Sequence, residues 1–185
     1  MKIKEPYKIS EEIRIVHKDG TGKVISDRII NSGFWQKLLC KLGLKHNCIT
    51  NIGMAQAAAW MLKDIDADHV TYPNCDWLGI GTGTTAAAAT DTGLELQKSR
   101  LAGVGTRETT TVTNDTAQIV VTFSKANDAG LTGTSAITEV GMFWHASTVS
   151  GVMLLRQVYS PADNCNWDSG DTLQVTVKVQ VKQGA

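Results

Sequence analysis

The sequence predicts a mainly β fold, a β-sandwich or a small antiparallel barrel, with one or two short helices in its N-terminal half. Three features support this. Residues 172–182 alternate polar and apolar side chains with the period of a half-buried strand, in which one face carries Leu173, Val175, Val177, Val179 and Val181. From residue 106 onward, Thr- and Val-rich segments are separated by turn-forming Asn, Asp and Gly. Residues 77–85 (WLGIGTGTT) mark the change from helix-capable to strand-forming sequence.

The N-terminal residues 1–30 are predicted to form an arm followed by a hairpin, and residues 31–185 to form a single β-rich domain. Ile13 and Ile15 alternate with charged residues, and residues 19–22 (DGTG) supply turn chemistry before a second apolar segment. Residues 1–10 are polar, and such a terminus can pair with the sheet edge of a neighbouring molecule. The arm residues expected to contact a partner are Lys2, Ile3, Lys4 and Tyr7.

Two helices are predicted between the hairpin and residue 77. Residues 34–43 place apolar side chains such as Leu38 and Leu42 at helical spacing, with Gly43 as a stop. Residues 51–64 contain the alanine run 57–59 and have Thr50 or Asn51 as a cap. We expect both helices to pack on the β fold.

The segment at residues 77–85 combines few bulky side chains with several glycines. Glycine in a strand often marks a bulge or a close backbone approach, which suits packing or assembly more than catalysis. We therefore expect a partner or assembly contact at Trp77, Gly79, Gly81 and Gly83. Trp167 lies in the polar segment 164–168, so among the five tryptophans it is the one expected at the surface.

Composition excludes several classes of function. The 185 residues carry 18 basic and 18 acidic side chains and a formal net charge of zero, so no overall field favours nucleic acid or an acidic membrane. No signal peptide or bilayer-spanning segment is expected. The four cysteines show no Cys-x-x-Cys spacing and are interpreted as mostly buried thiols.

Possible chemical motifs are incomplete. Residues 81–86 fit a dinucleotide-binding Gly-x-Gly-x-x-Ala pattern, but no βαβ unit follows. Asp64, Asp66 and Asp68 resemble the start of a calcium loop that lacks its later ligands. Cys40, His46 and Cys48 would be the nearest soft-metal ligands. Carboxylates such as Glu95, Glu108 and Glu139 are not brought together by any spacing, so no catalytic residue, cofactor or metal is predicted.

An ordered set of short motifs resembles a widespread group of small virion proteins of tailed bacteriophages. The set covers most of the chain, from about residue 49 to residue 181. Its members are residues 48–53 (CITNIG) before an alanine-rich helix, 77–85 (WLGIGTGTT), 91–95 (DTGLE), 113–118 (TNDTAQ), 137–143 (ITEVGMF), 153–158 (MLLRQV) and 169–176 (SGDTLQVT). The segment 34–45 looks like an addition to the usual pattern.

The resemblance implies a non-enzymatic β-rich structural module located in the virion and assembled in the host cytoplasm. The first hypothesis is a capsid cement or decoration protein that contacts the major capsid protein and copies of itself, as a homotrimer, without nucleic acid or membrane. The alternative is a tail, baseplate or fibre-associated protein whose segment 164–168 binds a host surface glycan. A third hypothesis, from another class, is a metal-dependent enzyme that uses Cys40, His46, Cys48 and the aspartates.

Overall fold

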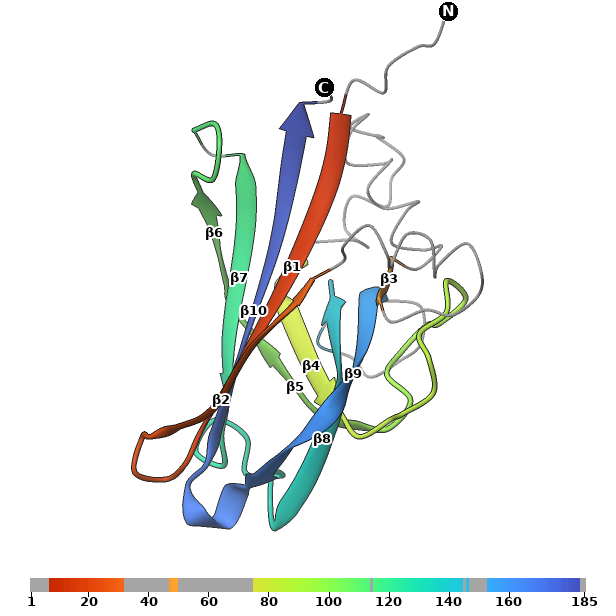
Figure 1. Cartoon of the computed structure of the whole chain (residues 1–185). Coiled ribbons are helices and arrows are strands. Elements are labelled where there is room, and N and C mark those ends of the chain that lie inside the picture. Colours follow the sequence, from red (N-terminus) through yellow and green to blue (C-terminus); the bar gives the residue numbers. More distant parts are fainter. Residues whose placement is uncertain are drawn as a thin grey trace, which may run out of the picture.

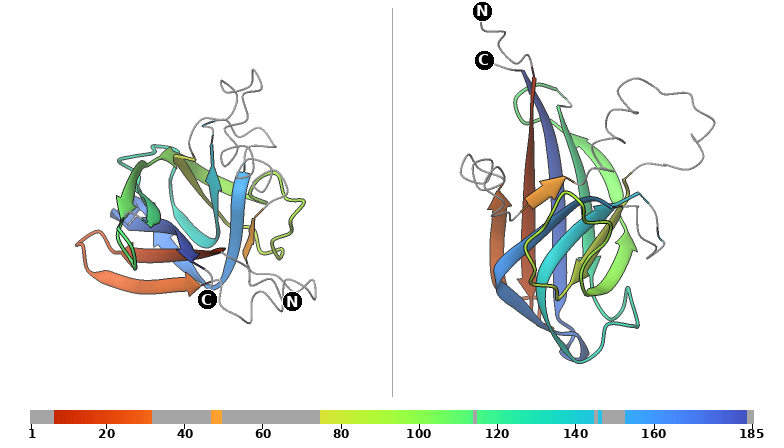
Figure 2. Two further views of the ribbon diagram at one scale, coloured as in Figure 1. Left: turned by 90° about the horizontal axis from the view of Figure 1, so that it is seen from above. Right: turned by 90° about the vertical axis from the view of Figure 1, so that its right-hand side faces the viewer.

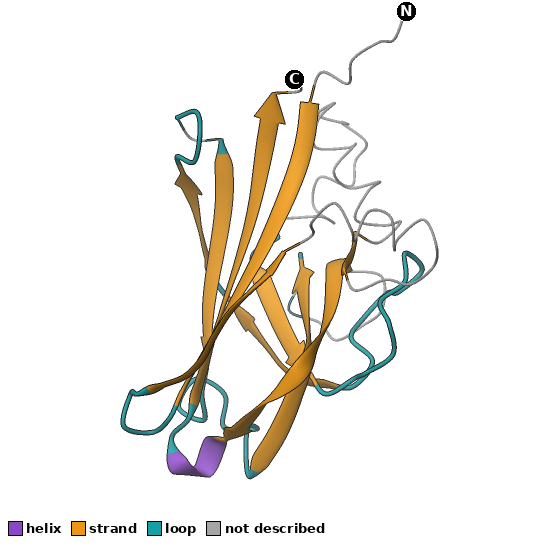
Figure 3. Ribbon diagram, in the orientation of Figure 1, coloured by secondary structure: helices purple, strands orange, loops and turns teal. Residues whose placement is uncertain are grey.

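Two five-stranded antiparallel sheets face each other across one core (Figures 1 and 2). The computed structural model describes residues 7–31, 47–49, 75–113, 115–144, 146 and 153–183. The mainly β fold predicted from the sequence is confirmed, in a sandwich-like arrangement. Within this described part, helical structure is limited to the short 3-10 turn η2 (Trp167–Ser169) (Figure 3). The helices predicted at 34–43 and 51–64 lie outside the described residues.

Each sheet mixes strands that are distant in the sequence. Sheet A contains, in spatial order, β2 (Val24–Asn31), β1 (Tyr7–Lys18), β10 (Thr172–Gln183), β7 (Thr116–Phe123) and β6 (Val104–Glu108). Sheet B contains β3 (Asn47–Ile49), β9 (Met153–Asn166), β8 (Thr134–Phe143), β4 (Trp77–Gly81) and β5 (Gln97–Ala102).

The predicted N-terminal hairpin exists as β1 and β2. Asp19 begins its turn, and its Oδ1 accepts hydrogen bonds from the backbone N–H groups of Thr21 (2.9 Å) and Lys23 (3.0 Å). Gly22 adopts a φ of 87°, a left-handed conformation that glycine reaches without steric cost. The turn therefore forms because the local sequence satisfies its own backbone.

The hairpin is part of the sandwich rather than a separate unit. β1 pairs with β10 over its whole length, from Tyr7 opposite Gln183 to Lys18 opposite Thr172. Ile13 and Ile15 are completely buried in the shared core. β1 and β2 therefore share one core with strands from residues 75–183, and residues 7–10 of the predicted arm are strand. The remaining arm residues, including Lys2, Ile3 and Lys4, lie outside the described residues.

The inner faces of the two sheets form the core. Alternate residues of β10 are buried as predicted, with Leu173 and Val175 at 0% exposure and Val177 at 2%. Leu78 and Ile80 of β4 meet them from sheet B and are also fully buried. The period-two pattern therefore identified the core face of β10 correctly.

Gly103 carries the chain from sheet B to sheet A between β5 and β6. A Cβ at this position would lie 2.7 Å from both Ile119 Cγ1 and Val121 Cγ2. Its N–H donates a 2.7 Å hydrogen bond to the carbonyl of Asp76. Only glycine lets the backbone pass this close to the core.

Across the described ranges, no helix is long and apolar enough to cross a membrane.

Candidate functional site

The outer face of sheet B contains a hollow lined by glycine and covered by residues 82–96. Gly79 of β4 lies opposite Gly141 of β8, so neither position contributes a side chain to this part of the face. A Cβ on Gly79 would lie 2.8 Å from Phe143 Cε2 and 3.2 Å from Leu94 Cδ1. A Cβ on Gly141 would lie 3.0 Å from Leu94 Cδ2. The loop therefore packs Leu94 into the hollow.

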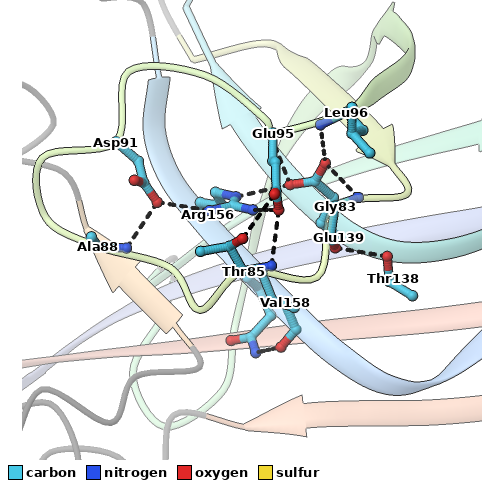
Figure 4. A network of polar contacts seen from close by, with 11 residues as sticks. Gly83, Thr85, Ala88, Asp91, Glu95, Leu96, Thr138, Glu139, Arg156 and Val158 are labelled. Carbon is cyan, nitrogen blue, oxygen red and sulfur yellow. Dashed lines mark hydrogen bonds and ion pairs between the residues drawn. The ribbon is translucent and has the colours of Figure 1, made fainter.

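Glu139 of β8 holds both ends of this loop (Figure 4). Its side chain is fully buried. Oε1 accepts hydrogen bonds from the backbone N–H groups of Gly83 (3.0 Å) and Leu96 (2.9 Å), and Oε2 accepts one from Glu95 N–H (3.1 Å). Since a buried carboxylate needs such donors, the loop ends and the carboxylate stabilise each other.

Arg156 of β9 completes the buried charge network. Nε donates to Glu139 Oε2 at 2.8 Å, Nη1 donates to Asp91 Oδ2 at 2.9 Å, and Nη2 pairs with Glu95 Oε2 at 3.4 Å. Burial disfavours the charged guanidinium, but the hydrogen bonds with Asp91 and Glu139 outweigh it and raise the pKa of Arg156. One cation thus connects β8, β9 and two points of the loop.

The loop carboxylates fold the loop onto itself. Glu95 accepts hydrogen bonds from the N–H of Thr85 (2.8 Å) and from its hydroxyl (2.7 Å). Asp91 Oδ2 accepts another from Ala88 N–H at 2.8 Å. The hydrogen bonds from Thr85, followed by the charge of Arg156, lower the pKa of Glu95 against the opposing effect of burial. Both side chains therefore accept hydrogen bonds that fix the loop (Figure 4).

This arrangement is suited to holding a shape. Glu139 is out of contact with solvent, and its two oxygens accept four N–H donors, which leaves no accessible oxygen for a proton transfer. The sequence did not predict this network. The sequence feature that could have indicated the network is a charged residue within each of two apolar segments: Glu139 in residues 137–143 and Arg156 in residues 153–158. The structure also brings Glu95 and Glu139 together, which no spacing indicated.

A second polar cluster closes the side of the sandwich between β2 and β9. Asp163 Oδ1 accepts from Ser26 Oγ and pairs with Arg28 Nη2, both at 2.5 Å. His17 Nε2 donates to Asp171 Oδ2 at 3.1 Å. Burial would raise the pKa of Asp171, but the hydrogen bonds from Asn166 N–H, His17 and Ser169 outweigh it and lower that pKa.

Cys165 lies near this second cluster and is completely buried. Burial, and then the charge of Asp163, raises the pKa of its thiol to about 12. The thiol therefore stays protonated and unreactive at neutral pH. In the described ranges, no three His, Cys, Asp or Glu side chains are grouped so that they could hold a metal ion. Cys40 and His46 lie outside those ranges, as does the side chain of Cys48.

The predicted contact residues fall in different environments. Trp77 is half-buried, whereas Gly79, Gly81 and Gly83 are buried. The close approach that these glycines permit is to the same chain, because a Cβ on Gly81 would collide with Glu139 Oε1. Their contact with a partner stays a prediction. The backbone of Tyr7 pairs with Gln183 in sheet A.

The surface position predicted for Trp167 is wrong. Its side chain is 1% exposed, and its backbone N–H donates a 2.9 Å hydrogen bond to the carbonyl of Gly133. Asn166 caps the η2 turn, because its side chain accepts from Ser169 N–H. The polar neighbours of Trp167 thus form a turn that folds the indole back over the core.

Four of the six large apolar side chains that are exposed in the described part lie on the edge strands of sheet A. Val24, Ile25 and Ile29 lie on β2, the edge strand of sheet A, with exposures of 49%, 56% and 53%. Leu96 is 58% exposed where the loop joins β5, and Val104 is 77% exposed on β6. These positions are candidate contact points.

Comparison of the chain with models of protein families, with curated proteins and with solved structures gives no match.

Proposed function

We propose that this chain is a non-enzymatic structural protein of a tailed-bacteriophage virion, and that it acts as a capsid cement or decoration protein. It binds the assembled shell of the major capsid protein and stabilises the junctions between its subunits. The partners in this proposal are the major capsid protein and copies of the chain itself, in a homotrimer. The place of action is the virion, after assembly in the host cytoplasm.

One observation carries the proposal. Four segments of the motif set that resembles virion proteins, residues 77–85, 91–95, 137–143 and 153–158, meet at Glu139 and Arg156. These residues are separated in sequence, yet they build one hydrogen-bonded structure. The motif set therefore corresponds to a structural device, which supports a scaffold or binding role over a catalytic one.

The charge of the molecule supports a protein partner. The chain has a formal net charge of zero, so long-range attraction to nucleic acid or to anionic lipid is weak. Exposed apolar side chains at strand edges are typical of protein contacts. Both properties suit a module that attaches to a protein shell.

The test is the copy number of the chain in purified virions. Quantitative mass spectrometry gives its molar ratio to the major capsid protein. A ratio of the same order as that of the capsid protein is expected for a cement protein. Complete absence of the chain from purified virions contradicts the proposal.

A ratio far below that of the capsid protein would place the chain in the tail, baseplate or fibre, the alternative function. The host-glycan contact within that alternative rested on an exposed aromatic or acidic loop at segment 164–168. Trp167 is buried, so the aromatic part of that motivation is lost, whereas the acidic Asp168 is exposed. The copy number separates the two locations without assuming either contact.

A further inference from the structure

We propose that residues 82–96, the pinned loop, form the surface by which this chain binds a virion protein, and that the bound protein surface is uncharged where it meets the loop. The inference rests on the proposed function, because it takes the partner to be part of the virion. It adds the contact surface and the chemistry of the partner. The pinned loop is long, and its backbone is fixed.

The loop contains no strand or helix between β4 and β5. Loops of this length without regular structure are uncommon in compact domains and are usually functional. Carboxylate acceptors nevertheless fix its backbone: buried Glu139 at Gly83 and Leu96, Glu95 at Thr85, and Asp91 at Ala88. Thr138 Oγ1 adds a 2.7 Å hydrogen bond to the carbonyl of Gly83.

The buried charges of the network are costly for the fold. Removing Glu139 and Arg156 from water is unfavourable, and buried ion pairs seldom stabilise more than apolar packing of similar volume. Covering the glycine hollow needs only apolar contacts such as those of Leu94. The network does more than cover the hollow. It also fixes Thr85 and Glu95, and both of these residues are exposed at the surface.

A loop held in one conformation loses little conformational entropy when it binds. Binding residues are commonly carried on loops that a rigid scaffold positions. The network in sheet B is such a scaffold, and the exposed part of the pinned loop is what it presents. A contact surface therefore accounts for both the length of the loop and the buried charges beneath it.

The exposed side of the pinned loop has a distinct chemistry. The loop contains no Lys, Arg, His or aromatic residue. Its exposed residues other than Glu95 are hydroxyl-bearing or small and apolar, followed by Leu96: Thr84, Thr85, Ala86, Thr90, Thr92 and Leu96. Glu95 is committed to Thr85 and Arg156. Nucleic acid needs cations, and sugars and bases favour aromatic platforms, so a neutral protein surface fits best.

The test introduces charge on this face without touching the network. In the double variant Thr90→Lys, Thr92→Lys, both substituted side chains are exposed and no hydrogen bond of the network uses them. The matched control is Ala129→Lys, Thr132→Lys, which adds the same charge to the exposed loop between β7 and β8. Phage that lack the gene are grown in cells supplying each variant, and copies per virion are counted by mass spectrometry.

The loop variant is expected to fall at least tenfold in copies per virion, while the control stays within twofold of the wild-type chain. Incorporation of the loop variant at the wild-type level overturns the inference. If the wild-type chain itself is absent from virions, the proposed function fails instead. Thermal unfolding of each purified variant checks folding, and the single variant Thr84→Lys replaces the double variant if the latter is unstable.

Discussion

The replacement Glu139→Gln tests the network most directly, because it changes charge and hydrogen bonding with almost no change in shape. Glu139 accepts two backbone N–H groups at Oε1, and at Oε2 it accepts Glu95 N–H and Arg156 Nε. Whichever way the amide is oriented, its NH2 group faces two donors. Two hydrogen bonds to a buried charge are lost and two donors are left unpaired.

Each such loss costs about 1.5–3 kcal/mol, so we expect a total near 4 kcal/mol. Urea denaturation followed by tryptophan fluorescence measures the change in the free energy of unfolding. If the loop opens without global unfolding, hydrogen exchange at the Gly83 and Leu96 amides accelerates roughly a thousandfold, since about 1.4 kcal/mol corresponds to a factor of ten.

The matched control is Glu108→Gln, the same change on β6, where Glu108 interacts with neutral donors at the surface. The free energy of unfolding is expected to change by no more than about 0.5 kcal/mol.

Arg156→Met alone should lower the free energy of unfolding about as much as Glu139→Gln does. The double variant should lower it by less than the sum of the two, because the clash between the amide and Arg156 Nε disappears. A Glu139→Gln variant as stable as the Glu108→Gln control, with unchanged amide exchange, would refute the network's role.

Three further predictions concern single positions. Gly79→Ala is expected to destabilise the fold by about 1–3 kcal/mol, because the new methyl group meets Phe143, whereas Gly105→Ala has room and should be neutral in chemical denaturation. Asp171→Asn is expected to cost about 2 kcal/mol at pH 7. Because the folded-state pKa of Asp171 is lowered, the carboxylate stabilises the fold fully above its unfolded pKa near 3.9. In denaturation curves the difference between the two proteins should shrink as pH falls below that value and be lost as pH falls through the lower folded-state pKa. Cys165, with a pKa of about 12, should resist iodoacetamide at pH 8 in the native protein and react in urea, as mass spectrometry can show; rapid native alkylation contradicts its burial.

The sequence predicted features that depend on local periodicity. The alternation in β10 identified its buried face, and the residues at 19–22 identified the hairpin turn. Both are determined by neighbours along the chain, where side-chain direction has a period of two and a turn satisfies its own backbone.

The network at Glu139 and Arg156 could not be found in this way. Its members meet only because β8 pairs with both β4 and β9, which places Glu139 opposite Gly81 and next to the strand that carries Arg156. Strand order is a long-range property that no local spacing encodes. The wrong expectation for Trp167 has the same origin, because its polar neighbours form a turn whose direction depends on the loop at Gly133.

The glycines of residues 77–85 gain a specific physical reason from this geometry. Gly81 and Gly83 keep clear the space that the Glu139 carboxylate occupies, and Gly79 keeps clear the space that Leu94 and Phe143 fill. Alanine at any of these positions would displace either the acceptor or the apolar contact that fixes the loop. The glycine-rich segment of β4, Glu139 of β8 and Arg156 of β9 are therefore parts of one structure. This structure holds the loop above it in a single conformation, so substitutions of these buried glycines should weaken the partner binding that we propose for the loop.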